Sequence, residues 1–151
     1  MTPFPALTLA DAPAGTPAVV PATARVQILS LAEPLPGFPG YRDYVLVPAE
    51  DAGRLAWLQS VAPDGPRFLV ASAADWFPDY APTLPGAVCV ELGLADTREA
   101  RLHCLVTVPV GDVAGATANL RAPVVVNPAT HRARQVVLLD AAHPIRRPLR
   151  R

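Results

Sequence analysis

Apolar and polar positions alternate with a period of two along much of the chain after residue 24, which is the periodicity of a β-strand. The clearest example is RLHCLVTVPV, where Leu102, Cys104, Val106 and Val108 fall on one face. The same reasoning, together with β-branched and aromatic content, predicts several other short strands. The expected strands cover residues 25–31, 43–47, 55–60, 67–71, 101–110, 120–127 and 132–140.

Turn-forming residues separate these segments. Pro36-Gly37, Pro39-Gly40 and Asn127-Pro128 each stand between two expected strands. The run Pro63-Asp64-Gly65-Pro66 joins LAWLQS to RFLVAS and predicts a β-hairpin. Residues 85–94 combine strand-favouring valines with a proline at one end and a glycine at the other, and we expect a short helix there.

Strands spaced in this way, with almost no amphipathic helix, predict an all-β, mainly antiparallel barrel or sandwich with one or two short helices. At 151 residues the chain fits a single domain. Residues 1–24 are rich in proline and alanine and are expected to form an extended arm, with a short strand at 6–10. The C-terminal IRRPLRR is polar, and we expect it to trail from the domain.

Charge is balanced overall but uneven along the chain. All 13 basic residues are arginines; residues 1–100 hold 5 of them against 11 acids, and residues 101–151 hold 8 against 2. Such a dipolar sequence can steer a charged partner, although ordinary solvated surface explains it equally well. We expect Cys89 and Cys104 to be reduced thiols inside the fold. Since the sequence has no apolar run of about 18 residues and no basic leader, we expect a cytoplasmic protein with no membrane partner.

Catalytic chemistry has little support in the sequence. The three histidines have no metal-ligand spacing, and neither a phosphate-binding loop nor a GxSxG motif is present. We therefore expect no enzyme activity, no cofactor and no metal. Asp75 and Asp79 flank WFP and leave a hydrolase with paired carboxylates as an alternative, although loop aspartates more often bond the local backbone.

A nucleic-acid-binding barrel is a second alternative. The arginines that would contact RNA phosphates are Arg132, Arg134, Arg146, Arg147, Arg150 and Arg151. Single-strand binders usually place aromatic side chains within the basic groove. Here all nine aromatic residues lie in the first 80 positions, so we expect no direct nucleic-acid partner.

Protein binding fits the residues better, because aromatic residues and arginines on a rigid scaffold form interface hot spots. Within WFPDY we expect contacts from Trp76, Phe77, Asp79 and Tyr80, although the aromatics can equally close a barrel end. The stretch TANLRAPVVVN supplies three further candidates. They are Thr117, Asn119 and Arg121, with a turn-forming structural role as the alternative for Asn119.

Eight motifs occur in a characteristic order. They are LPGFPGY (35–41), AWLQS (56–60), RFLV (67–70), WFPDY (76–80), LVTVP (105–109), TANLRAPVVVN (117–127), RQVVL (134–138) and HPIRRPL (143–149). This series resembles the flagellar assembly factor FliW family, over about residues 25–149. The resemblance implies a compact β-barrel-like domain that is not an enzyme.

The resemblance also implies two protein partners, flagellin and CsrA, a dimeric RNA-binding repressor of flagellin translation. A member of this family sequesters CsrA when flagellin is scarce and releases it when flagellin accumulates. It is thought to act on CsrA away from the RNA-binding surface. This is partner switching at equilibrium and requires no covalent step.

Overall fold

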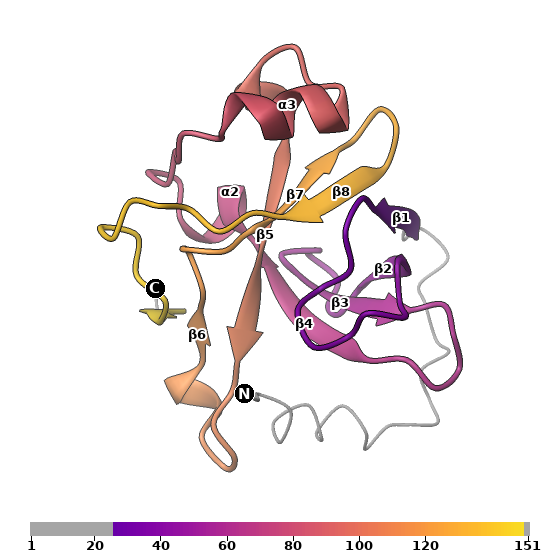
Figure 1. The fold of residues 1–151 in the computed structure, drawn as a ribbon. Coiled ribbons are helices and arrows are strands. Elements are labelled where there is room, and N and C mark those ends of the chain that lie inside the picture. The colour runs from indigo at the N-terminus through magenta and orange to yellow at the C-terminus, as the bar shows by residue number, and fades with distance from the viewer. Residues whose placement is uncertain (1–25, 150–151) are drawn as a thin grey trace.

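The computed structural model describes residues 26–149, so the expected arm at 1–24 and its strand at 6–10 lie outside the described residues. Four strands follow one another at the start: β1 (Gln27–Leu31), β2 (Asp43–Pro48), β3 (Leu55–Ser60) and β4 (Arg67–Ser72). They pair in sequence as an antiparallel meander, and the expected hairpin joins β3 to β4 with Trp57 opposite Leu69 (Figure 1).

The remaining strands close this meander into a barrel. They are β5 (Arg101–Thr107), β7 (Val124–Asn127) and β8 (Arg132–Gln135). β5 pairs with β4 on one side and β7 on the other, and β8 returns to β1. The ring therefore runs β1-β2-β3-β4-β5-β7-β8 and back to β1, and only the β8–β1 pairing is parallel. The all-β, mainly antiparallel fold is confirmed, and it is a barrel.

The barrel interior is filled by alternate residues of the strands, as the period-two pattern predicts. The inward residues include Leu29, Tyr44, Leu58 and Val70, all buried. β7 is buried on both faces: Val124 and Val126 point into this core, while Val125 packs outside the barrel with Leu92. Burial on both faces explains why three consecutive valines occur there.

Two short helices cover the outside of the barrel: α2 (Ala73–Trp76) and α3 (Gly86–Leu92). The expected helix within residues 85–94 is thus confirmed, and Gly93 ends it in the left-handed conformation with φ 73°. The buried Asn127 anchors α3, because its Nδ2 donates to the carbonyl of Leu92 at 2.7 Å. Its Oδ1 accepts from the Ala129 N–H at 2.9 Å and holds the β7–β8 turn.

Three boundaries differ from the expected ones. Strands end earlier than the expected 110 and 140, and the expected strand at 120–127 begins only at Val124. The reason for the last is that residues 119–122 form a turn and Pro123 has no N–H for a ladder bond. After β8 ends, the chain stays beside the residues that precede β7, because the Val136 N–H donates a hydrogen bond to the Pro123 carbonyl.

The C-terminal segment does not trail, which corrects the expectation from its polarity. Two short strands missed in the sequence, β6 (Thr117–Ala118) and β9 (Arg147–Pro148), pair with each other, and β6 also pairs with the end of β5. The Leu149 N–H donates to the Ala116 carbonyl. Backbone bonds thus attach this segment, whose Arg146 and Arg147 remain exposed. In Figure 1 its short strand is the yellow arrow near the C terminus.

Candidate functional site

Three segments far apart in sequence meet beside the outer face of β5: residues 76–80, 117–123 and 141–149. We call their meeting place the junction. Tyr80 joins the first two, because its hydroxyl donates a hydrogen bond to the backbone carbonyl of Leu120. Its ring meets His143 of the third segment edge-on, with centroids 5.4 Å apart. Burial raises the pKa of Tyr80 well above its usual value, so the phenol remains protonated as a donor.

Asn119 and Arg121 organise the second and third segments. The Asn119 Oδ1 accepts hydrogen bonds from the N–H groups of Arg121 and Ala122, at 2.9 and 3.2 Å. The Arg121 guanidinium donates to the carbonyls of Ala141 and His143, both at 2.9 Å. Asn119 therefore has the turn-forming role that the sequence left as an alternative, and Arg121 holds the C-terminal segment.

Trp76 and Phe77 are fixed by packing and by arginines. The Trp76 Nε1 donates to the Arg54 carbonyl at 3.0 Å, and the Arg54 guanidinium lies 5.2 Å from the ring centroid. Phe77 is only 5% exposed, and the Arg147 guanidinium covers its ring at 5.0 Å. These contacts hold the loop in place, and part of the loop remains exposed to solvent.

A small hollow of about 180 Å³ lies at the junction, between Phe77, Asp79, Tyr80, Leu120 and Arg147. Pro78 also lines it, and Pro78, Asp79 and Arg147 are its exposed members. Thr117 sits nearby in β6, where it pairs with Thr107 and Pro148. The structure thus gathers Phe77, Asp79 and Tyr80 around one hollow, with the TANLRAP residues beside it, while Trp76 turns toward Arg54.

The paired-carboxylate hypothesis fails on geometry. Asp79 lines the small hollow, whereas Asp75 lines a separate and larger one. Both side chains are exposed. A hydrolytic pair must flank one substrate bond, and these two carboxylates do not share a pocket.

Of the arginines proposed for RNA, Arg150 and Arg151 lie outside the described residues, and the other four do not form one groove. Arg134 is ion-paired with Glu91 at 2.8 Å and with Glu33 at 3.3 Å. Arg147 covers Phe77, and β8 and β9 lie on different sides of the molecule in Figure 1. Guanidinium groups engaged and dispersed in this way give RNA phosphates no continuous track, so no observation favours the RNA alternative.

The cysteines are both free thiols, Cys104 buried and Cys89 partly buried. Burial raises the pKa of Cys104 to about 12, so this thiol is protonated at neutral pH. Within residues 26–149, no three His, Cys, Asp or Glu side chains are grouped closely enough to hold a metal ion. No helix in that range is long and apolar enough to span a membrane.

The sequence reasoning also missed a third aromatic–arginine pair, outside the junction. The Arg67 guanidinium lies 4.4 Å from the Trp57 ring centroid on the outer face of the β3–β4 hairpin. The register of the hairpin would have predicted this contact. Arg67 lies opposite Gln59 and is therefore a diagonal neighbour of Trp57. No comparable local signal connects Tyr80 with Leu120, since the two are 40 positions apart.

Comparison with known proteins gives consistent results. The family model described as "FliW protein" matches residues 18–149, starting within the segment expected to be an arm. A flagellar assembly factor FliW from Symbiobacterium thermophilum is 38% identical over 115 residues, covering 75% of this chain and 82% of that protein. The one from Moorella thermoacetica is 30% identical over 122 residues, covering 81% and 77%. A crystal structure of the flagellar assembly factor FliW superimposes with a TM-score of 0.72 at 25% identity, covering 82% of this chain and 85% of that one.

Proposed function

The chain belongs to the FliW family of flagellar assembly factors, and from this premise we propose that it binds flagellin and the repressor CsrA in the cytoplasm and exchanges one for the other. The observation that carries the proposal is the family match across residues 18–149, which includes all of the described residues. Binding alone accounts for the activity, so the protein acts as a regulator and not as an enzyme.

The regulation follows from linked equilibria. Each partner that occupies the protein lowers the amount available to the other, in proportion to its concentration and affinity. Abundant flagellin therefore releases CsrA to repress flagellin translation, and export or depletion of flagellin reverses the exchange. CsrA is held away from its RNA-binding surface, so its RNA affinity falls through a coupling free energy and not through direct blockage.

We assign one partner contact to the junction. Its segments are joined by Tyr80 and Arg121, so little conformational entropy is lost when a partner docks. Asp79 and Arg147 present opposite charges at the solvent-facing rim of the hollow. We include Trp76 and Thr117 in the proposed contact surface because they belong to the segments that meet at the junction, although neither lines the hollow.

Calorimetric titration with flagellin and with CsrA from the same organism tests the function. We expect saturable binding of each, and weaker apparent CsrA binding when flagellin is already present. Heat changes absent with both partners would refute the proposal.

A charge reversal at Asp79 tests the assigned surface. Asp79→Arg should weaken binding of at least one partner about tenfold or more, because it places like charges together at the hollow rim. Asp43→Arg is the matched control: Asp43 is also exposed, lies at the start of β2 and does not line the hollow. Equal affinities for the two variants would remove the junction from the proposal and leave the partner exchange standing.

A further inference from the structure

A hollow lies at one end of the barrel. It has a volume of about 540 Å³, within the size range of ligand sites, and barrel mouths are a common location for such sites. Along β1, β4 and β5 the inward side chains change here from apolar to polar. Leu29, Val70 and Leu105 contact the core, and the next inward positions toward this end are Gln27, Ser72 and His103.

These polar groups have no partner within residues 26–149. No hydrogen bond or ion pair in that range involves the side chain of Gln27, Ser72, Asp75, Arg101 or His103. Ser72 stands at the N-cap of α2, where a hydroxyl often bonds the backbone, yet it makes no capping bond. Polar groups turned into a concave site and left unpaired are available to a ligand.

The imidazole of His103 is neutral at physiological pH. Burial is the main reason that its pKa is lowered to about 4; the positive charge of Arg101 lowers it further, and Asp75 acts in the opposite direction. A neutral imidazole offers one N–H donor and one acceptor. Arg101 and Asp75 are thus both near this ring, yet they form no ion pair with each other.

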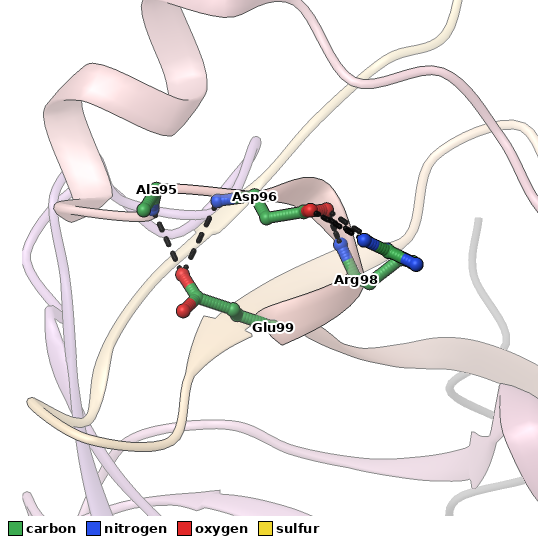
Figure 2. A network of polar contacts seen from close by, with 4 residues as sticks. All are labelled: Ala95, Asp96, Arg98 and Glu99. Atoms are coloured by element: carbon green, nitrogen blue, oxygen red, sulfur yellow. Dashed lines mark hydrogen bonds and ion pairs between the residues drawn. The ribbon is translucent and has the colours of Figure 1, made fainter.

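The neighbouring Arg98 also lines the hollow, but its guanidinium is paired with an acidic residue. Its guanidinium donates to the Asp96 carboxylate at 3.0 Å, while the Glu99 carboxylate accepts from the N–H groups of Ala95 and Asp96. Figure 2 shows this closed network, which belongs to the 3₁₀ turn η2 (Thr97–Glu99) just before β5. Of the two arginines that line the hollow, Arg101 is the one that forms no ion pair within residues 26–149.

We infer that the barrel mouth binds a short extended peptide segment of one partner, whose carboxylate is received by Arg101 and His103. The planar guanidinium matches a carboxylate, and the imidazole N–H adds a second donor. Gln27 and Ser72 offer donors and acceptors to the peptide backbone, while Leu46 and Ala56 contribute apolar wall. Asp75 disfavours a doubly charged anion such as phosphate and favours a segment that also carries an amide or amine. This inference rests on the proposed function and names a contact for it.

Two substitutions in the full-length protein test the inference by calorimetry with flagellin and CsrA. Arg101→Glu reverses the charge at an exposed position, and His103→Leu removes the donor and acceptor while keeping an apolar group. We expect both to weaken the same partner at least tenfold. Arg132→Glu is the matched control, because Arg132 is an exposed strand arginine of β8 that does not line the hollow. Thermal unfolding of each variant verifies the fold.

The outcomes separate this inference from the proposed function. If the unmodified protein binds its partners and folded Arg101→Glu binds both with unchanged affinity, the barrel mouth is not a partner site, while the exchange of partners stands. If the unmodified protein binds neither partner, the proposed function fails and the inference fails with it. Extending the C terminus of the affected partner by a few glycines identifies the carboxylate's source: lost affinity indicates the chain end, and retained affinity an acidic side chain.

Discussion

Replacing Tyr80 by phenylalanine removes a single hydroxyl and tests whether the junction is held together as the structure shows. The hydroxyl donates to the carbonyl of Leu120, a residue that is 2% exposed. Loss of the donor leaves that carbonyl unpaired away from water, which costs about 1–3 kcal/mol. We therefore expect Tyr80→Phe to lower the free energy of unfolding by about 2 kcal/mol, equivalent to a fall in Tm of roughly 6–8 °C for a domain of this size.

Two other tyrosines provide controls for the same change. The Tyr41 hydroxyl bonds the exposed Asp64 at 3.3 Å, so Tyr41→Phe should change the stability by less than about 0.5 kcal/mol. The Tyr44 hydroxyl is buried and has no hydrogen-bond partner in the described structure. Tyr44→Phe should therefore leave stability unchanged or raise it by about 1 kcal/mol, since an unpaired buried polar group is removed.

The pH dependence gives an independent check. The pKa of Tyr80 is raised in the folded state above its unfolded value near 10, chiefly by burial. Its contribution is therefore complete below about pH 10 and is lost as the pH rises toward the folded pKa. The stability gap between the unmodified protein and Tyr80→Phe should narrow above pH 10. Urea unfolding followed by circular dichroism measures both effects; equal stability of the Tyr80 and Tyr41 variants would refute the reasoning.

Three further predictions concern the fold and its thiols. Asn127→Ala should destabilise the protein by about 2–3 kcal/mol in urea unfolding, because the carbonyl of Leu92 loses its buried donor; a change below 0.5 kcal/mol would contradict this. Gly65→Ala should cost about 1–3 kcal/mol by the same assay, because the new Cβ would lie 2.2 Å from the Ser60 Oγ and displace a buried side chain; unchanged unfolding would show that the turn adapts freely. Burial and a pKa of about 12 should protect Cys104 from a thiol reagent at pH 8 until the protein is denatured, and rapid modification in the native state would oppose that.

The strands and turns were largely predictable because their signals are local. Alternation in RLHCLVTVPV located β5, and Pro63 to Pro66 located the β3–β4 hairpin. Gly93 marked the end of α3 because the left-handed conformation that closes a helix favours glycine. No local signal predicted that the WFPDY and TANLRAP motifs would lie next to each other; the sequence showed only that both belong to one small domain.

The C-terminal segment shows where local reasoning fails. Its arginines and prolines predict a segment exposed to solvent, and these side chains are indeed exposed. Its backbone nevertheless forms hydrogen bonds with β6 and with the guanidinium of Arg121. Polarity of side chains says little about such backbone pairing, because every non-proline residue carries the same donor and acceptor. The sequence could not predict the group of unpaired polar side chains at the barrel mouth either, since Gln27, Ser72 and His103 come from three separate strands.

The sequence alone determined where most strands and the helix lie and to which family the motif order belongs, because period, turn chemistry and motif order are properties of the chain itself. Which face of β5 turns into the barrel was not determined in this way: Leu105 contacts the interior core, while Cys104 and Val106 pack outside it. Only the tertiary structure decided that β4 meets β5 and β8 meets β1, and that Tyr80 reaches a carbonyl 40 positions away. Closing the barrel pairs strands across long stretches of chain, and the pairing depends on how all the inward side chains fill one volume together.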